Sequence, residues 1–226
     1  MKQLTCLHGF LGTPSDWDFL PYENIVKPNL FSSPPRPFCS WAKQFNQNLP
    51  KADNILLGYS LGGRLAIHAM IDAPQKYSCA IIISSHYGLK NEQEKLERLE
   101  KDASWAKAFQ NDSWDVLMEK WNNQGVFNDK VIRRERDYNR NNLAEAMLTW
   151  SLGEQLYLKK EVERLKIPIL WIAGENDRKF KLIAQSLSLS HPESVIWIAK
   201  ESGHRVPWQQ QAIFLKQIDN FILTRT

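Results

Sequence analysis

A serine between two glycines is the feature of this chain that most directly suggests chemistry. Ser60 lies at the centre of a Gly-Tyr-Ser-Leu-Gly sequence at 58–62, immediately after the apolar run 54–57. In this pattern the serine occupies a sharp turn from a strand into a helix, where flanking glycines allow strand and helix to approach closely. Such a nucleophile elbow presents the hydroxyl for use as a nucleophile or as a base.

A serine hydroxyl becomes reactive when a histidine accepts its proton and an acid orients that histidine. Asp177 follows the apolar run 169–173, and His204 follows the run 195–199. The carboxyl ends of parallel strands meet at one edge of a sheet. We therefore expect Ser60, Asp177 and His204 to form a catalytic triad.

Other residues compete for the roles of base and acid. In addition, Asp177 could be only a turn residue and His204 only a surface loop residue. His86 follows a strand and is the best alternative base, and Glu175 is the alternative acid. The remaining histidines fit the role of base less well. His8 lies too near the first strand, His68 lies two turns into the helix after the serine, and His191 precedes its strand.

Two further features could complete a site around the serine. The sequence His-Gly-Phe-Leu-Gly at 8–12 follows the first strand, so the backbone N–H groups of Phe10 and Leu61 are expected to form an oxyanion hole, unless 8–12 is a simple glycine turn. Arg64 lies one helical turn after Ser60 on the same face and could grip a substrate carboxylate, or be a surface arginine. Tyr59 could donate a hydrogen bond there or simply pack.

The elements that must position these residues alternate along the chain. Short apolar runs typical of buried parallel strands occupy 3–7, 54–57, 79–84, 169–173 and 195–199. Helical patterns follow at 61–71 and 209–223. The proline-rich stretch 21–37 is expected to be loop, with a short strand at 24–27. This alternation predicts an α/β fold with a mostly parallel central sheet flanked by helices.

The interval 87–166 interrupts this alternation, because it contains no convincing strand. Its segments 92–109 and 113–121 are amphipathic and helical. We predict a core formed by 1–86 and 167–226, with 87–166 inserted as a helical cap over the strand ends.

Composition limits the classes of function. The chain has 226 residues, 43% of them hydrophobic, and a formal net charge of +4 with dispersed basic residues. These values argue against nucleic acid as a partner and suit an anionic small molecule. No secretory signal or membrane span is visible, and the three cysteines form no Cys-x-x-Cys pair. We expect a soluble cytoplasmic protein with no membrane partner, no metal and no cofactor.

Taken together, the motifs resemble one branch of the α/β-hydrolases, the 2-succinyl-6-hydroxy-2,4-cyclohexadiene-1-carboxylate synthases of menaquinone biosynthesis. The resemblance spans most of the chain and rests on the segments 8–12 with 16–17, 58–64, 88–109, Trp121-x-x-Gln124-x-Val126-Phe127, and Gly174-Glu175-x-Asp177-x-Lys179-Phe180. These motifs are far more specific than the elbow alone.

The resemblance implies a lyase that eliminates pyruvate from 2-succinyl-5-enolpyruvyl-6-hydroxy-3-cyclohexene-1-carboxylate, with the triad acting as a base. Because that substrate carries three carboxylates, the resemblance nominates arginines as its ligands, with Tyr59 and Trp121 lining the pocket. These arginines are Arg64, Arg98 and Arg136, although Arg140 fits the last position equally well.

Two other functions remain open. An esterase or thioesterase, including one that cleaves a pimeloyl-carrier-protein methyl ester, would use Ser60 as a nucleophile, and only this alternative adds an acidic carrier protein as a partner. A binding protein would keep the fold without catalysis, which leaves the histidine and aspartate unexplained.

Overall fold

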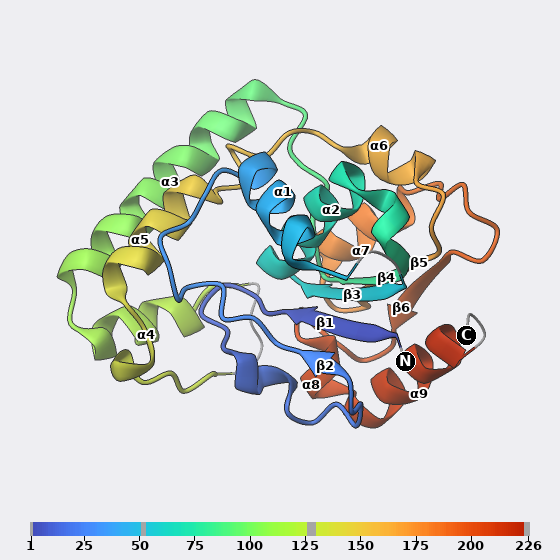
Figure 1. The fold of residues 1–226 in the computed structure, drawn as a ribbon. Helices are drawn as coiled ribbons and strands as arrows, with labels where there is room; N and C mark the ends of the chain where they lie inside the picture. The colour runs from blue at the N-terminus through green and yellow to red at the C-terminus, as the bar shows by residue number, and fades with distance from the viewer. Residues whose placement is uncertain (1, 51–52, 126–129, 224–226) are drawn as a thin grey trace.

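One parallel sheet organises the molecule. The computed structural model describes residues 2–50, 53–125 and 130–223, and in these ranges six strands lie in the order β2-β1-β3-β4-β5-β6 (Figure 1). Every neighbouring pair is parallel. The strands are β1 (Gln3–Leu7), β2 (Ile25–Val26), β3 (Asn54–Tyr59), β4 (Tyr77–Ile83), β5 (Ile169–Gly174) and β6 (Val195–Ala199).

The central strands are apolar at successive residues because helices cover both faces of the sheet. Neighbouring side chains of a strand point to opposite faces. Leu56 packs into the core that contains Leu65, whereas Leu57 packs into a second core that contains Phe214. Both leucines are fully buried, so β3 is held from above and below.

The helices form a layer on each face of the sheet (Figure 1). One face carries α1 (Phe38–Asn48), α2 (Leu61–Asp72) and α7 (Arg178–Gln185), and the other carries α8 (Val206–Gln209) and α9 (Gln211–Leu223). Short 3-10 turns occur at η1 (Pro14–Trp17), η2 (Pro74–Lys76) and η3 (Glu135–Asp137).

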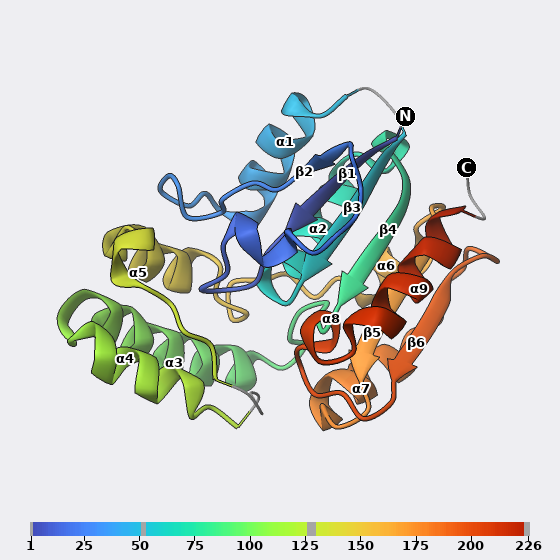
Figure 2. The ribbon, with the colours of Figure 1, turned by 90° about the horizontal axis from the view of Figure 1, so that it is seen from below.

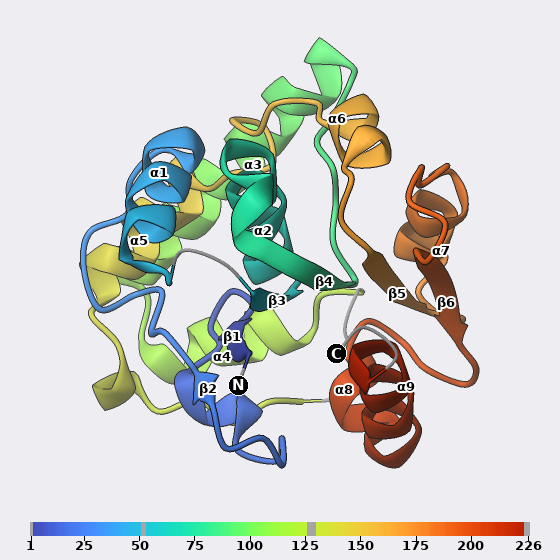
Figure 3. The same ribbon diagram turned by 45° about the vertical axis from the view of Figure 1, so that its right-hand side comes forward.

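A separate group of helices covers the carboxyl ends of the strands (Figure 2). These are α3 (Glu92–Asn111), α4 (Trp114–Asn122) and α5 (Arg140–Thr149), which we call the cap. α3 packs along α5. α6 (Lys159–Arg164) follows in sequence but lies beside α2 on the core, away from the cap (Figures 1 and 3). The division of the chain at residues 87 and 166 stays a prediction.

The α/β fold class predicted from the alternation of apolar runs is confirmed. The stretch 21–37 contains β2 and otherwise no regular element, as its prolines predict. The sequence analysis did not identify α1, whose partly polar sequence buries only Phe38, Ala42 and Asn46. None of the helices in the described ranges combines the length and apolar character that crossing a membrane requires.

Candidate active site

Ser60 sits at a strained turn between β3 and α2. Its backbone has φ 52° and ψ −110°, a conformation that costs a non-glycine residue about 1–3 kcal/mol. The surrounding structure fixes it, because the Ser60 N–H donates to the carbonyl of Ile83 (2.9 Å) and the Ser60 carbonyl accepts from the N–H of Arg64 (3.1 Å) and the hydroxyl of Ser85 (2.9 Å). The turn therefore holds the side chain of Ser60 in one direction.

The glycines of the elbow are required by close backbone packing. A Cβ on Gly62 would lie 2.3 Å from the carbonyl oxygen of Leu7, and a Cβ on Gly58 would lie 2.5 Å from the carbonyl oxygen of Gly62. Both distances are far below van der Waals contact, and the atoms that would be met belong to backbone. β1, β3 and α2 can approach each other this closely only with glycine at these positions.

Replacing Gly62 with alanine is therefore expected to lower the free energy of unfolding by about 1–3 kcal/mol, since backbone must shift to admit the methyl group. Gly125→Ala is the matched control, because a Cβ at Gly125 meets nothing within 4 Å. Urea unfolding followed by circular dichroism measures both variants. Equal stability of the two would contradict the close approach of α2 to β1.

The structure brings Ser60, His204 and Asp177 together. Nδ1 of His204 lies 2.6 Å from Oδ2 of Asp177, and Nε2 of His204 lies 3.2 Å from Oγ of Ser60. Asp177 is placed by the loop after β5, where it also caps α7. Because Nδ1 donates its proton to the carboxylate, the lone pair of Nε2 faces the serine. The arrangement can take the proton of Ser60 and stabilise the imidazolium that forms.

The competing histidines have other environments. His8 is buried, its Nε2 accepts the N–H of Leu30, and its Nδ1 therefore donates to the carbonyl of Gly9. Burial lowers the pKa of His8 to about 4 and that of His68 to about 4. Among the hydrogen bonds described for these three histidines, only one of His204 joins Ser60, so His204 is the histidine placed to act on it.

The alternative base, His86, and the alternative acid, Glu175, have other hydrogen-bond partners. His86 lines the cavity described below, but its Nδ1 accepts the N–H of Gly88, and burial lowers its pKa to about 3. Glu175 is exposed and accepts the N–H of Glu201. Asp177 is thus the carboxylate that orients His204.

Phe10 and Leu61, the two residues expected to supply an oxyanion hole, line the same cavity as Ser60. Leu61 is the first residue of α2, so its N–H has no acceptor within the helix. Phe10 belongs to a turn that the N–H of Gly12 closes on the carbonyl of Gly9 (3.0 Å). The role of these two N–H groups as an oxyanion hole stays a prediction, and it requires both to point toward the space beside Ser60.

A cavity of about 250 Å³ lies between the cap and the carboxyl ends of the strands. The core contributes the triad serine and histidine together with Arg64, and the cap contributes polar and aromatic side chains. Its other lining residues include Phe10, Tyr59, Leu61, His86, Arg98, Lys101, Asp102, Trp105, Trp121, Gln124, Lys179 and Phe180. The cavity is therefore both positively charged and aromatic.

Arg64 presents its guanidinium to this cavity without a carboxylate partner among the described residues. It donates to the side-chain oxygen of Gln155 (3.3 Å) and lies over the ring of Phe38. Burial, and then the neighbouring charge of Arg98, lower the pKa of Arg64 to about 9, against the opposing effect of Asp102. The guanidinium remains charged at neutral pH and can bind an anion.

Arg98 reaches the cavity from α3, as the resemblance implies. Its Nε donates to Oδ2 of Asp102 at 2.8 Å, and Asp102 is 2% exposed. Asp102 lies one helical turn after Arg98 on the same face of α3. Because this carboxylate is buried, its hydrogen bond restricts the position of the Arg98 guanidinium.

Two lysines at the cavity were not selected from the sequence. Lys101 lies one turn after Arg98 on α3, and Lys179 lies two residues after Asp177 in α7. The helical spacing from Arg98 could have identified Lys101. The position of Lys179 beside the triad acid was visible in the motif at 174–180, but a lysine in a charged helix start is usually solvated.

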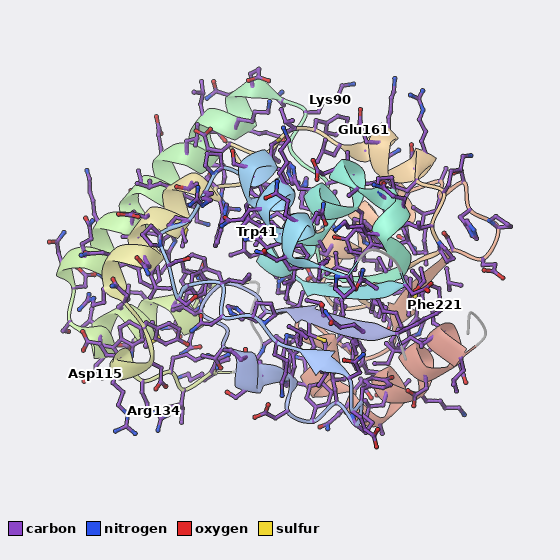
Figure 4. The ribbon with its side chains drawn as sticks, in the orientation of Figure 1. Trp41, Lys90, Asp115, Arg134, Glu161 and Phe221 are labelled. Atoms are coloured by element: carbon purple, nitrogen blue, oxygen red, sulfur yellow. The ribbon has the colours of Figure 1, made fainter. Side chains whose placement is uncertain are left out.

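Arg136 does not line the cavity in this structure. It lies on the exposed turn η3, and Arg134 projects into solvent from the same segment (Figure 4). Arg140, the alternative to Arg136, donates to the carbonyl oxygens of Phe109 and Asp112 at the end of α3. The reason is that α5 begins at Arg140, next to the carbonyl groups left free at the end of α3.

The two aromatic residues expected at the pocket do line it. Tyr59 packs against the rings of His204 (5.5 Å between centroids) and Trp208 (4.9 Å). Trp121 packs on Phe10 (5.2 Å) and on Trp105 (5.1 Å). Val126 and Phe127, from the same motif as Trp121, lie outside the described residues. In the described ranges, no group of three or more His, Cys, Asp or Glu side chains could hold a metal ion.

Comparison with protein families and curated proteins gives consistent matches. A family model described as serine aminopeptidase, S33, matches residues 38–188. A Bacillus subtilis (strain 168) protein named putative 2-succinyl-6-hydroxy-2,4-cyclohexadiene-1-carboxylate synthase is 30% identical, covering 98% of this chain and 90% of its own length. A Photorhabdus laumondii protein with that name, without "putative", is 29% identical over 89% of this chain and 80% of its own.

Solved structures with the same fold include "Structure of MenH from S. aureus", with a TM-score of 0.88 and 23% identity over 99% of this chain and 94% of that one. A thermophilic esterase from Thermogutta terrifontis, with malate bound, has a TM-score of 0.76 and 16% identity over 100% and 91% of the two chains.

Proposed function

The chain belongs to the α/β-hydrolase superfamily and, within it, to the 2-succinyl-6-hydroxy-2,4-cyclohexadiene-1-carboxylate synthase family, and on this basis we propose that it is a lyase. Its substrate would be 2-succinyl-5-enolpyruvyl-6-hydroxy-3-cyclohexene-1-carboxylate, from which it eliminates pyruvate. The names of the relatives support this reaction, and the chemistry of the cavity supports the substrate class.

The observation that carries the proposal is the pairing of a serine–histidine–aspartate arrangement with a strongly cationic cavity. Among the described residues that line it, four carry a cationic side chain and one, Asp102, carries a carboxylate; the four are Arg64, Arg98, Lys101 and Lys179. A hydrolase acting on a neutral ester has no need of this excess charge. A substrate with three carboxylates does, because charge-assisted hydrogen bonds would hold and orient it.

The proposed reaction uses Ser60 as the base. Ser60 takes a proton from the substrate ring while passing its own proton to Nε2 of His204, and Asp177 stabilises the imidazolium. The electrons of the broken C–H bond move into the ring, and the C–O bond to the enolpyruvyl group breaks. The departing enolate takes up the proton held by the imidazolium of His204 and becomes pyruvate. This second transfer returns the triad to its starting state.

The backbone N–H groups of Phe10 and Leu61 would stabilise the negative charge that develops when the ring proton is removed. Such donors act most strongly when they are fixed before the reaction and shielded from water. Both residues line the cavity beside Ser60, and Leu61 is buried. The oxyanion hole would therefore serve an enolate or a carboxylate rather than a tetrahedral intermediate.

The deciding experiment supplies the purified protein with enzymatically generated enolpyruvyl substrate. Pyruvate is measured with lactate dehydrogenase, and formation of the cyclohexadiene product is followed by its absorbance. We expect both products in equal amounts, at a rate that exceeds the uncatalysed elimination. Cleavage of simple acyl esters without any pyruvate release would instead favour the esterase alternative, with Ser60 as a nucleophile.

A further inference from the structure

The turn that carries Phe10 is held by a relay of hydrogen bonds that begins in the segment connecting the cap helices α4 and α5. The Tyr138 hydroxyl, from the segment between η3 and α5, donates to the carbonyl oxygen of Leu11 at 2.8 Å. The peptide unit that contains this carbonyl also contains the N–H of Gly12. That N–H donates to the carbonyl oxygen of Gly9 at 3.0 Å.

The second step of the relay reaches the oxyanion donor. The carbonyl of Gly9 and the N–H of Phe10 belong to one peptide unit, and each peptide unit is planar. Fixing the carbonyl of Gly9 therefore fixes the direction of the Phe10 N–H. His8 contributes from the core side, since its Nδ1 also donates to the carbonyl of Gly9 (2.8 Å).

Leu11 is the residue of this turn whose conformation most needs support. Its φ is 55°, in the left-handed region that a branched apolar residue rarely adopts. Leu11 is buried, and its carbonyl accepts the hydroxyl of Tyr138. Without that bond, the peptide unit between Leu11 and Gly12 loses a constraint on its rotation.

The cap grips the neighbouring residues as well. The ring of Phe10 packs against Phe109 of α3 (5.4 Å between centroids) and Trp121 of α4. Asp16, which follows the turn, accepts two hydrogen bonds from Arg133 at 2.7 and 2.8 Å. These contacts hold the cap against the turn, and among those described here the bond of the Tyr138 hydroxyl is made to the turn's backbone.

We propose that Tyr138 is a positioning residue for catalysis, which sets the direction of the Phe10 N–H through the carbonyls of Leu11 and Gly9. This inference rests on the proposed role of Phe10 in the oxyanion hole. It makes the active geometry dependent on the cap, because the hydroxyl that completes the relay belongs to the segment that carries the cap helices. Tyr138 itself does not line the cavity.

The test is Tyr138→Phe, which removes the hydroxyl and keeps the ring stacked on Trp114. We expect kcat to fall about 10-fold while KM stays within about twofold, because a misdirected donor weakens the transition state and not ground-state binding. Amide hydrogen exchange, measured by mass spectrometry on peptides covering 8–13, should become faster. The readout of exchange does not depend on any substrate.

Tyr87→Phe is the matched control, because the hydroxyl of Tyr87 forms one hydrogen bond, with Ser186, away from the turn. Tyr138→Phe should lower Tm by about 2–4 °C, and Tyr87→Phe by less, because the Tyr87 hydrogen bond is exposed and water can replace it. The control should leave kcat and the exchange of 8–13 at wild-type values.

The results separate this inference from the proposed reaction. If wild-type protein releases no pyruvate, the reaction is wrong, and kcat is then compared on an aryl ester, for which the same N–H would be used. Unchanged exchange of 8–13 in Tyr138→Phe overturns the relay whatever the substrate. A raised KM with an unchanged kcat overturns it too, because Tyr138 would then be a substrate contact.

Discussion

Replacing Ser60 with alanine is expected to lower kcat for pyruvate release by about 10²- to 10⁴-fold, the range typical of the loss of a positioned base. The hydroxyl lies 3.2 Å from Nε2 of His204, and alanine leaves no group to carry the proton from the substrate to the histidine. KM should change little, because the cationic side chains that hold the carboxylates remain. Stopped assays of pyruvate at saturating substrate measure the effect.

Ser78→Ala is a suitable control for this variant. Ser78 lies near the start of β4, at the opposite end of the sheet, and its hydroxyl bonds only the carbonyl of Asn54 among the described contacts. It should retain wild-type turnover. A Ser60→Ala protein that kept more than about a tenth of wild-type kcat would exclude Ser60 as the base, and His204 would then have to act directly on the substrate.

Replacing Arg64 with alanine is expected to raise KM by about 100-fold, as the loss of a charge-assisted, bidentate contact to a carboxylate would. Arg64 is well suited to this role, because its guanidinium faces the cavity with a neutral partner, Gln155, and no carboxylate from the described residues. A smaller fall in kcat should follow if the carboxylate also orients the ring proton toward Ser60.

The stability of the Arg64→Ala protein provides a second readout. Burial lowers the pKa of Arg64, which means that the charged side chain is disfavoured in its site. Removing it should therefore cost little free energy of unfolding, in spite of the lost contact with Phe38. Arg64→Lys should restore part of the affinity, because an ammonium supplies charge without the planar fork.

Arg178→Ala is the matched control, because Arg178 is exposed at the start of α7 and does not line the cavity. It should leave KM unchanged. An Arg64→Ala protein with wild-type KM would remove the argument for a carboxylate at this position, and with it the strongest reason for preferring the lyase to an esterase.

The sequence predicted the elements of the sheet well, because strands buried on both faces leave continuous apolar runs. The same reasoning located Ser60, Asp177 and His204, since each lies shortly after the end of such a run and parallel strands bring their carboxyl ends together. Arg64 was also accessible to sequence reasoning, because one helical turn places it on the face of Ser60.

The cap was less predictable, because helical periodicity does not say which face of a helix meets the site. The sequence did not distinguish Arg136 from Arg140 as the third arginine expected at the site. The position of each side chain depends on where α5 begins and on which carbonyl groups lie near it. Tyr138 gave no signal at all, since its hydrogen bond with Leu11 joins residues 127 positions apart. Contacts of this kind arise only when the cap is seated on the core.

The place where the cap leaves and rejoins the core has a consequence for how such an enzyme could change its substrate. The chain departs after β4 and returns before β5, and these strands are paired neighbours, with Ile83 opposite Ile172. The cap helices α3, α4 and α5 could be exchanged in evolution or by design without altering the order of the strands, provided that Ser85, which bonds the carbonyl of Ser60, and α6, which packs beside α2, are kept. The proposed relay adds a condition to such an exchange, because a new cap would also need a hydroxyl that donates to the carbonyl of Leu11. Without that hydroxyl, the protein would bind its new substrate but convert it with a low kcat.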